Sequence, residues 1–599
     1  MRQARHSLPL VIGGWGTRGK SGTERLKAAV FNAMGLSVLS KTTGCEAMFL
    51  YSPANRPLRE MFLFRPFDKA SIWEQVDLVR LSSRFKVDVF LWECMGLNPR
   101  YVQILQEQWM RDDLSTITNC YPDHEDIQGP AGIDIPQVMQ RFVPRDSRVI
   151  TTEHNMYPFL EEAARRKGSD IIKVEESDGD LLPADVLARF PYEEHPTNIA
   201  LVMRMARELG IEEDFAVKEM ADRVVPDLGV LKVYPAAPVR GRKLQFINGM
   251  SANERHAALA NWERLELTGL SVEHNPEQWV ATVINNRADR IPRSQVFARM
   301  IAEELSADRH FLIGSNLDGL KSYIDDAWAR RLDDMDLGNG SGEYVAETVR
   351  TLARQLRVPT TPAAVYARLA AMLEDRANCL PSHLPDSPLP SSEELRALLA
   401  DHCVNSVDEQ VLCALEQYKK DCRELEQYRL LYEALKQENP PADQQGELVR
   451  QLTEWFDSRI IIIWDYHARG NDVIQTLTEN TPPGLLSHIM GMQNIKGTGL
   501  DFVYQWQAWD THHKLARQLL EGDTGEALEA ARLLANREQF GPLDIEFLTD
   551  ALATASERRE TQVEATQAEI ALTQSRLPGK KAPPVNRPCN AGAQASATN

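Results

Sequence analysis

An apolar run that leads into a glycine-rich loop constrains the fold of this chain more than any other feature. Leu8–Ile12 has the character of a buried strand, and it runs into Gly14-x4-Gly19-Lys20-Ser21 and then into a helical segment. This order of strand, loop and helix matches a P-loop in spacing and in context. The glycines let backbone N–H groups curl around phosphates, and the start of the helix adds a favourable dipole. A simple glycine-rich turn is the alternative interpretation.

The loop also supplies two side chains suited to nucleotide chemistry. Lys20 would neutralise charge on the β- and γ-phosphates, and the Ser21 hydroxyl would reach a Mg²⁺ ion. The candidate nucleotide-binding residues in this stretch are Gly14, Gly16, Thr17, Arg18, Gly19, Lys20, Ser21 and Gly22. A P-loop alone leaves open whether the γ-phosphate is transferred to water, to a hydroxyl or to a carboxylate.

Strand-like and helical segments alternate from the start of the chain to about Val233. The pattern predicts an α/β fold, a doubly wound parallel sheet of P-loop type covered by helices on both faces. A smaller Rossmann-like domain should follow. The predicted strands are Leu8–Ile12, Val87–Trp92, Ser115–Thr118, Val149–Thr152 and Ile171–Val174 in the first part, and Leu244–Asn248, Val280–Asn285 and His310–Gly314 in the second.

Helical spacing replaces strand signals from about residue 317 to residue 456. We interpret this stretch as a packed helical insertion, with oligomerisation or docking to a membrane partner as alternatives. Arg459–Trp464 and Leu485–Met492 then predict strands that complete the second sheet. The predicted domains are an ATP-binding central domain at 1–235, a discontinuous Rossmann-like domain at 236–316 and 457–510, the insertion at 317–456, a helical extension at 511–575 and a disordered tail at 576–599.

The composition limits which partners the protein can bind and indicates the cellular compartment in which it works. The 67 basic and 86 acidic residues give a net charge of -19, which opposes binding to nucleic acid and to anionic lipid. The longest apolar run, Ile460–Trp464, is far too short to cross a bilayer, and the start of the chain lacks the apolar core of a signal peptide. The eight cysteines are scattered without a CxxC pair, as expected for free thiols. We therefore expect a cytoplasmic protein that does not bind nucleic acid.

Acidic and imidazole groups follow two of the predicted strands. Glu93 ends the run Val87–Trp92, and Ser115–Thr118 is followed by Asn119 and then by Asp123 and His124. Ligands of doubly wound sheets bind at the carboxyl ends of the strands, so these groups should face the P-loop. Oxygen-rich ligation beside a triphosphate suits Mg²⁺ or Mn²⁺. An ordinary carboxylate at a strand end is the alternative for Glu93.

Several further motifs resemble the Mur ligase superfamily, and within it the poly-γ-glutamate synthase subgroup called CapB or PgsB. The resemblance covers about residues 8–315 and 458–506 and implies ATP-dependent amide formation through an acyl phosphate. The motifs that carry it are Gly16–Ser21, Lys41-Thr42-Thr43-Gly44, Glu93-Cys94-Met95, Thr118-Asn119 with Asp123-His124, Gly129, Pro226–Gly229, Phe246–Asn253, Asn286–Arg290 with Arg293-Ser294, and Gly491–Gly497.

The resemblance also implies roles for individual residues. Lys20, Glu93, His124 and Arg287 would be catalytic, and Ser21, Thr43, Glu93 and His124 would hold the metal ions. Asn198, in the stretch that begins at His195, and Asn253 would join the loop in binding ATP. Asn198 has an alternative interpretation as the cap of a helix over Ile199–Leu209.

The chain departs from the family pattern in three places. Peptidoglycan Mur ligases carry a UDP-sugar-binding domain before the P-loop, but only about ten residues precede the P-loop in this sequence, so a nucleotide-sugar substrate is not expected. Met139 and Gln140 stand where many Mur enzymes carry a carbamylated lysine, which leaves open how a second metal is held. The chain also starts without the membrane-anchoring helix usual in the subgroup.

The substrate implied by the resemblance is glutamate or a glutamyl chain. It further implies a membrane partner subunit of a polyglutamate synthase complex, which would bring the protein to the inner membrane, and we expect a homo-oligomer. Two other functions remain open: a P-loop ATPase or kinase, and a scaffold subunit that needs nucleotide only for its structure.

Overall fold

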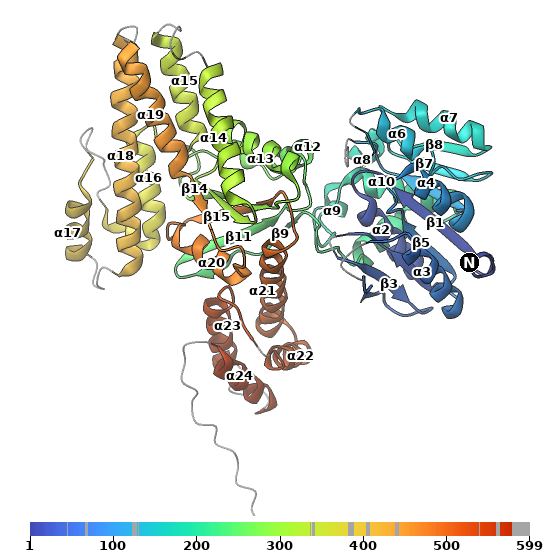
Figure 1. Ribbon diagram of the computed structural model, residues 1–599. Helices are drawn as coiled ribbons and strands as arrows, with labels where there is room; N and C mark the ends of the chain where they lie inside the picture. Colours follow the sequence, from blue (N-terminus) through green and yellow to red (C-terminus); the bar gives the residue numbers. More distant parts are fainter. Residues whose placement is uncertain are drawn as a thin grey trace, which may run out of the picture. The chain divides into compact units, whose positions relative to one another are not determined.

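The computed structural model describes residues 1–44, 46–65, 70–121, 128–129, 131–335, 337, 342–380, 389–402, 408–437, 442–537, 539–558 and 564–577. The chain forms two compact units, Met1–Val233 and Tyr234–Asn599. Each unit has a mainly parallel sheet of its own (Figure 1), so the predicted α/β fold class is confirmed.

The sheet of the first unit has eight strands in the order β4-β3-β2-β5-β1-β6-β7-β8. All neighbours pair in parallel except β2 with β3 and β3 with β4, which are antiparallel. Strand β1 therefore lies between β5 and β6, where the order of the strands reverses. The strands are β1 (Leu10–Trp15), β2 (Val38–Lys41), β3 (Met48–Ser52), β4 (Arg59–Phe62), β5 (Val89–Glu93), β6 (Leu114–Ile117), β7 (Arg148–Thr151) and β8 (Asp170–Lys173).

Side chains of β1 alternate between two hydrophobic layers. Ile12 packs in one layer with the buried faces of α2, α10 and α11, and Val11 packs in the other with α3, α6 and α7. This is the two-faced covering that a parallel sheet requires. The helical segments are α1 (Arg2–His6), α2 (Lys20–Ala33), α3 (Trp73–Phe85), α4 (Pro99–Gln103), η2 (Ile104–Met110), α6 (Asp134–Met139), α7 (Tyr157–Lys167), α8 (Glu176–Asp180), α9 (Ala184–Leu187), α10 (Pro196–Glu208) and α11 (Glu213–Arg223).

In the second unit the strand order is β10-β11-β15-β12-β13-β14, and β14 and β15 come from far along the chain. The prediction that the two late strands complete this sheet is confirmed. The strands are β10 (Ala237–Val239), β11 (Arg242–Asn248), β12 (Gln278–Asn286), β13 (Arg309–Gly314), β14 (Ile460–Ile462) and β15 (Leu486–Met492), with β9 (Lys232–Val233) preceding them. Helices α12 (Arg255–Arg264) and α13 (Ile291–Glu303), the short η3 (Leu267–Gly269) and helix α20 (Gly470–Glu479) connect them.

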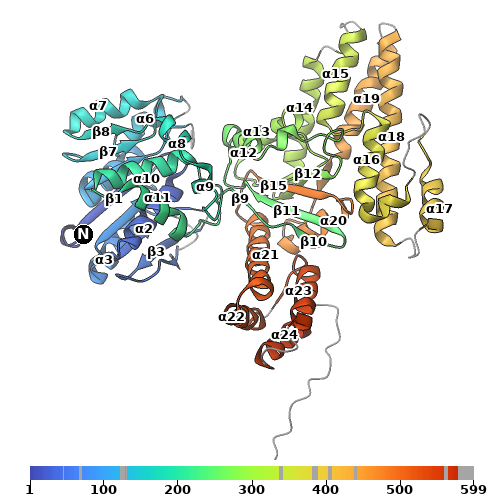
Figure 2. The same cartoon turned by 180° about the vertical axis from the view of Figure 1, so that it is seen from behind.

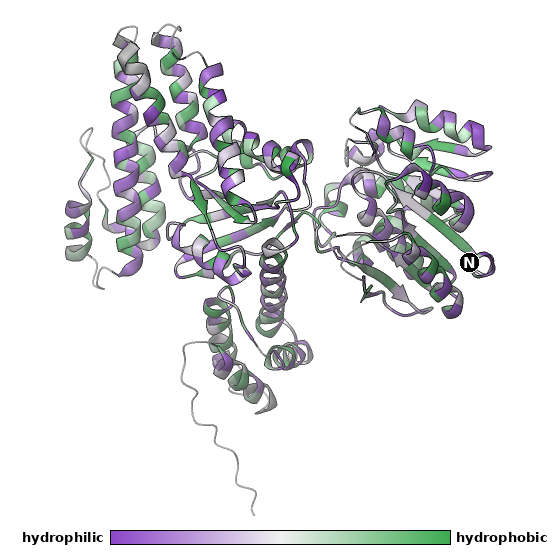
Figure 3. Cartoon of the chain, in the orientation of Figure 1, coloured by the Kyte–Doolittle hydropathy of each residue, from purple (hydrophilic) through white to green (hydrophobic). Residues whose placement is uncertain are grey.

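Two groups of helices extend from this second sheet in opposite directions (Figures 1 and 2). One lies between β13 and β14 in the chain, and hydrophilic and hydrophobic residues alternate along its helices, while the strands are mainly hydrophobic (Figure 3). It comprises α14 (Leu317–Asp334), α15 (Gly342–Gln355), α16 (Pro362–Leu373), η4 (Glu374–Cys379), α17 (Ser392–His402), α18 (Glu409–Gln437) and α19 (Ala442–Ser458). The other comprises α21 (Thr498–Glu521), α22 (Thr524–Ala535), α23 (Ile545–Arg558) and α24 (Glu564–Arg576).

The C-terminal helices share an apolar core of their own. Helix α21 runs without a break from Thr498 across residue 510, where the sequence pattern placed a domain boundary. Phe502 and Trp506 on α21 pack on Phe246 of β11, so this helix begins against the sheet and ends in the extension. The finer division of the second unit stays a prediction, and residues 578–599 of the predicted tail lie outside the described residues.

A buried group of charges fastens the insertion to the second sheet. Asp308, directly before β13, accepts hydrogen bonds from Arg357 at 2.5 Å and from Arg368 of α16 at 3.1 Å. Arg459, directly before β14, forms a bidentate pair with Glu424 of α18 at 2.8 and 2.7 Å. Burial alone raises the pKa of Asp308, but the two guanidinium groups and the N–H of Val280 outweigh it, so the pKa lies below its usual value. These charges neutralise one another within the fold.

Candidate functional site

The glycine-rich loop leaves β1 at the carboxyl edge of the first sheet and ends as α2 begins. Gly16 has φ +146° and Gly19, the N-cap of α2, has φ +80°, a region of backbone conformation that favours glycine. A Cβ atom on Gly16 would stand 1.9 Å from the Thr118 hydroxyl, and one on Gly19 would stand 2.5 Å from Oδ1 of Asn198. The loop therefore needs glycine at both positions, as a phosphate-binding loop does.

Residues after β6 hold this loop in place. The Asn119 carbonyl accepts from the Thr17 N–H at 3.0 Å, and Asn119 Oδ1 accepts from the Arg18 N–H at 2.8 Å. The Thr118 hydroxyl donates to the Arg18 carbonyl at 2.5 Å. Lys20 folds back over the loop and donates to the Thr17 carbonyl at 3.0 Å. The predicted Thr118-Asn119 pair thus lies beside the loop and fixes its backbone.

Glu93 brings together three of the predicted metal-binding residues. Its carboxylate accepts from the Ser21 hydroxyl at 2.7 Å, from the Thr43 N–H at 2.6 Å and from the Thr43 hydroxyl. The side chains come from β5, from the start of α2 and from the loop after β2, and Glu93 is 1% exposed. Hydroxyl and carboxylate oxygens beside a phosphate-binding loop are ligands that suit Mg²⁺ or Mn²⁺.

The described residues do not complete a metal site by themselves. They contain no group of three or more His, Cys, Asp or Glu side chains placed to hold an ion. His124 and Asp123 lie outside the described residues. The oxygen set around Glu93 nevertheless fits a cation that also takes phosphate oxygens and water as ligands, which is how Mg²⁺ is usually held beside a nucleotide.

A buried ion pair lies behind the loop. Glu24 and Lys27 of α2 pair with each other, and Lys27 Nζ also donates to the Thr116 hydroxyl at 2.7 Å. Gly14 leaves room for the Glu24 carboxylate, because a Cβ there would stand 1.8 Å from its Oε1. Burial raises the pKa of Glu24 to about 7. The sequence analysis missed this pair, although the spacing of Lys20, Glu24 and Lys27 along one helix face was a usable signal.

A second missed group contains two basic residues and one carboxylate. Arg65 donates through Nε and Nη2 to the two oxygens of Glu74 at 2.9 and 3.2 Å. Lys41 Nζ lies 3.8 Å from Oε2 of the same carboxylate. Burial lowers the pKa of Lys41 to about 8. No sequence pattern joined these residues, because they come from the end of β2, from the segment after β4 and from the start of α3.

Residues of the loop, Thr43 and Arg65 line one cavity of about 190 Å³. Polar and cationic groups and apolar side chains both contribute to its walls, so it can hold a small charged group away from bulk water. The lining residues are Trp15, Gly16, Thr17, Lys20, Thr43, Arg65, Ala70, Cys94, Met95, Leu97, Gln128 and Met139.

Asn198 lies over the loop and does not cap its helix. Helix α10 begins at Pro196, and its N-cap is His195, whose Nδ1 accepts from the Thr197 N–H at 3.4 Å. Asn198 donates through Nδ2 to Glu194 at 2.8 Å, and its Oδ1 is the atom that a Cβ on Gly19 would meet. The capping alternative is therefore wrong, and nucleotide binding by Asn198 stays a prediction.

Arg287 and Asn253 belong to the second unit. Arg287, directly after β12, forms a bidentate ion pair with Asp289 at 3.0 and 2.8 Å, and its side chain is 32% exposed. Arg290 approaches the same carboxylate at 3.8 Å. Asn253 lies between β11 and α12. The arginines thus form an exposed ion-pair group in this structure, and the roles proposed for Arg287 and Asn253 stay predictions.

Side-chain amides stiffen the carboxyl edge of the second sheet. Asn285 donates to the carbonyls of Asn494 at 2.8 Å and of Lys496 at 2.7 Å. Gln493 donates through Nε2 to Asn286 at 2.7 Å, and Asn286 donates to the Ser315 carbonyl at 2.8 Å. These contacts tie the ends of β12, β13 and β15 into one rigid edge. The motif Gly491–Gly497 pointed to this region without indicating which atoms would pair.

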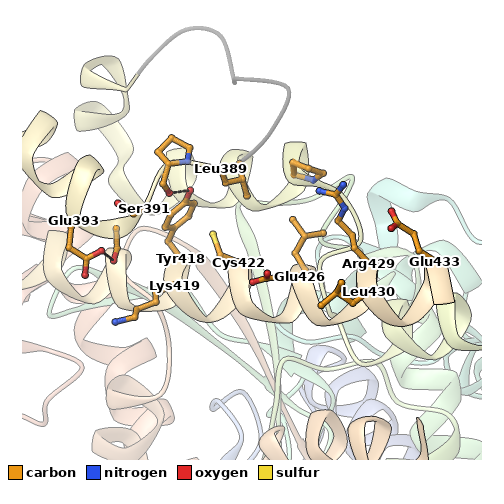
Figure 4. A pocket seen from close by; sticks show the side chains of 14 residues that line it. Leu389, Ser391, Glu393, Tyr418, Lys419, Cys422, Glu426, Arg429, Leu430 and Glu433 are labelled. Carbon is orange, nitrogen blue, oxygen red and sulfur yellow. Dashed lines mark hydrogen bonds between the residues drawn. The ribbon is translucent and has the colours of Figure 1, made fainter. Parts of the chain in front are cut away.

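A second cavity, of about 530 Å³, lies in the helical insertion. Tyr418, Cys422, Arg429 and Leu430 of α18 point into it, and Tyr418 donates to the Pro390 carbonyl at 2.8 Å (Figure 4). None of the predicted nucleotide, metal or catalytic residues lines this cavity. It belongs to the second unit, whereas the phosphate-binding loop belongs to the first.

The first unit is thus an α/β domain of P-loop type, with its loop, an acidic residue and two hydroxyls gathered at one sheet edge. Residues 233–370 match the family model described as the poly-gamma-glutamate synthase CapB C-terminal domain. The resemblance to CapB that the motifs carry is therefore confirmed.

Two curated relatives are similar over about half of this chain. PGA synthase CapB of Bacillus subtilis strain 168 is 28% identical over 320 residues, which are 53% of this chain and 78% of that protein. Capsule biosynthesis protein CapB of Bacillus anthracis is 26% identical over 311 residues, 52% of this chain and 64% of that protein. Among solved structures, FolC of E. coli with ADP aligns with 56% of this chain and 85% of its own, with a TM-score of 0.39 and 18% identity.

No helix in the described ranges combines the length and the apolar character that crossing a membrane requires.

Proposed function

We propose that this protein is an ATP-dependent ligase that forms γ-glutamyl-type amide bonds through an acyl-phosphate intermediate, releasing ADP and phosphate. The observation that carries the proposal is the junction at Glu93, where the Ser21 and Thr43 hydroxyls meet a carboxylate beside a glycine cradle. The similarity to two CapB proteins and to the CapB C-terminal domain supplies the substrate class.

In the proposed reaction the loop binds the triphosphate and Lys20 offsets the charge of its β- and γ-phosphates. A substrate carboxylate attacks the γ-phosphorus, and an amine then displaces phosphate from the acyl phosphate, so one difficult step becomes two easier ones. Thr118 and Asn119 keep the donor N–H groups preorganised, which is where most of the acceleration should arise. Mg²⁺ or Mn²⁺, held by Ser21, Thr43 and Glu93, would supply further charge neutralisation.

Four residues enter the proposal through the resemblance. His124 would hold a second metal ion, and Asn198 and Asn253 would bind the nucleotide. Arg287 would act on substrate or phosphate once it exchanges Asp289 for an anion. The position of Asn198 against Gly19 supports its assignment.

The proposed substrate is glutamate or a glutamyl chain, since both curated relatives are CapB proteins. We also propose that the protein is cytoplasmic, works as a homo-oligomer and reaches the inner membrane through a partner subunit of a polyglutamate synthase. These last assignments rest on the resemblance.

The test is incubation of the purified protein with ATP, Mg²⁺ and each of the twenty amino acids in turn. Phosphate release is measured together with products by mass spectrometry, and Lys20→Ala serves as the inactive control. Glutamate-dependent release, with products that grow by glutamyl units, is the expected result.

Two outcomes would favour the other functions. Phosphate release at the same rate without any amino acid would favour a P-loop ATPase. Absence of turnover, together with normal assembly of Lys20→Ala into a complex with partner subunits, would favour a scaffold that needs nucleotide only for its structure.

A further inference from the structure

Arg65 lines the same cavity as Lys20 and Thr43, but the phosphate-binding loop does not account for it. It follows the exposed edge strand β4, yet its side chain is only 10% exposed. The loop N–H groups and Lys20 are sufficient for a triphosphate. Glu74 is the carboxylate that pairs with Arg65 among the described residues, and that pair uses one edge of the guanidinium group.

The geometry of Arg65 leaves one edge of its guanidinium group facing away from Glu74. Glu74 takes the side edge, through Nε at 2.9 Å and Nη2 at 3.2 Å. A guanidinium group carries five N–H donors in a planar fork, and its two edges can each form a bidentate pair with a carboxylate. The Nη1–Nη2 edge is therefore suited to a second planar anion.

The charges around Glu74 also favour an anion. Lys41 lies 3.8 Å from Oε2 of Glu74, so one carboxylate faces two cations. Glu93 and the Cys94 thiol are the other groups that act on Lys41, and Glu93 is engaged with Ser21 and Thr43. Lys20 and Arg65 are the charged side chains that line the cavity among the described residues, so an anion that enters it meets two cations.

We propose that Arg65 binds the substrate carboxylate that receives the phosphoryl group. This inference rests on the proposed ligase function. In that step a carboxylate oxygen forms a bond to the γ-phosphorus, the bond from that phosphorus to the β,γ-bridging oxygen breaks, and ADP leaves with the electron pair. Arg65 orients the carboxylate and offsets its repulsion from the triphosphate. A cavity of about 190 Å³ has room for these reacting groups.

The experiment compares Arg65→Ala and Arg65→Lys with the wild type, with Arg59→Ala on the exposed strand β4 as the matched control. Calorimetry measures binding of γ-glutamylglutamate to full-length protein loaded with a non-hydrolysable ATP analogue and Mg²⁺. A second titration measures the ATP analogue itself. We expect Arg65→Ala to weaken dipeptide binding by about 10- to 100-fold, as for loss of a charged hydrogen-bonded pair, with a smaller loss for Arg65→Lys.

Affinity for the ATP analogue should change by no more than about twofold, because the hydrogen bonds of Arg65 within the described residues go to Glu74 and none of them goes to the loop. Equal losses of analogue and dipeptide binding would overturn the inference and assign Arg65 to the nucleotide phosphates. Unchanged dipeptide affinity in Arg65→Lys and Arg65→Ala, or a wild type that binds no dipeptide, would also overturn it. If Arg65→Ala fails to fold, Arg65→Lys gives the answer, because it keeps the charge and removes the fork.

The proposed function can fail separately. A wild type that binds the dipeptide but releases no phosphate would refute the ligase, whereas a selective loss of dipeptide binding in Arg65→Ala would still support the carboxylate site.

Discussion

Glu93 in the first unit and Asp308 in the second are both buried carboxylates beside a strand of a parallel sheet, but they have opposite surroundings. Glu93 ends β5, at the carboxyl edge where ligands of such sheets bind, and Asp308 precedes β13, at the other edge. Asp308 is paired with Arg357 and Arg368. Glu93 forms no ion pair with Lys or Arg in the described part of the chain, and its hydrogen bonds come from neutral groups of Ser21 and Thr43.

This difference separates a structural charge from one available to a ligand. The charge of Asp308 is neutralised inside the fold, and removing it would leave Arg357 with backbone carbonyls only and Arg368 with Asp421 at 3.7 Å. The hydroxyls that donate to Glu93 are neutral and Lys41 acts on it without forming an ion pair in the described part of the chain, so a cation can still bind there. Strand edge and partner charge together therefore indicate which buried carboxylate serves the fold and which serves chemistry.

The largest expected effect tests the structural side of this comparison. Asp308→Ala should lower the free energy of unfolding of the second unit by about 3–5 kcal/mol, because Arg357 and Arg368 lose their buried partner. Denaturant unfolding, monitored through hydrogen exchange in peptides from β13, measures the loss of unfolding free energy. Asp325→Ala, at an exposed ion pair of α14, is the control and should cost less than about 1 kcal/mol. An equal loss of unfolding free energy in both variants would mean that the buried Asp308 stabilises the fold no more than an exposed ion pair does.

The next effect concerns the phosphate-binding loop. Lys20→Ala should lower ATP-dependent phosphate release by about 10²- to 10³-fold, since a preorganised cation facing the reacting phosphate is lost. The unfolding free energy should stay near that of the wild type, because the Lys20 side chain lines the cavity and folds over the loop instead of packing in the core. Arg80→Ala, which removes an exposed charge from α3, is the control. Full activity of Lys20→Ala would contradict the role of Lys20 in binding the phosphates of ATP.

Glu93→Gln sharpens the functional side of the comparison. The amide keeps an oxygen that can accept from Ser21 and Thr43, but the charge that would face the metal is lost. The Mg²⁺ concentration at half-maximal activity should rise by about 10- to 100-fold. Glu162→Gln, on the exposed face of α7, should leave it unchanged. A loss of stability as large as that of Asp308→Ala, with unaltered Mg²⁺ dependence, would mean that Glu93 stabilises the fold, as Asp308 does, and does not bind the metal ion.

The smallest effect is a pH dependence in the second unit. Burial, followed by the charge of Arg459, lowers the pKa of His310 from its usual 6.5 to about 3. Unfolded chains take up this proton near pH 6.5 and the folded unit does not, so the stability is present above pH 6.5 and is lost as the pH falls toward 3. Between pH 7.5 and 5.5 the loss from this group should be about 1.4 kcal/mol.

Denaturant unfolding at several pH values measures this loss. His310→Asn removes the titrating group, while its amide can still reach the Thr282 hydroxyl that contacts Nδ1 at 2.8 Å. Between pH 7.5 and 5.5, the unfolding free energy of the variant should fall by about 1.4 kcal/mol less than that of the wild type. Identical slopes in the wild type and in His310→Asn would mean that His310 is not held neutral.

Sequence reasoning located the strands that carry the P-loop and Glu93, because fully buried parallel strands are continuous apolar runs. It missed β2, β3 and β4, the last of which is wholly exposed and shows no alternation. That omission concealed the meeting of Lys41, Arg65 and Glu74. The capping alternative for Asn198 fails for a local reason: His195 has the extended backbone and the acceptor that a cap needs, so Asn198 falls inside the first turn.

The sequence alone determined the loop, because only glycine accepts the backbone of Gly16 and Gly19 without collision and the lysine and serine that follow are contiguous with them. It also placed Glu93 at a strand end. Only the tertiary structure decided which charges meet: Glu93 with hydroxyls from two other segments, Asp308 with guanidinium groups from the insertion, and Arg65 with Glu74. The physical reason is that ion pairing and burial depend on distances between elements far apart in the chain, which no local periodicity records.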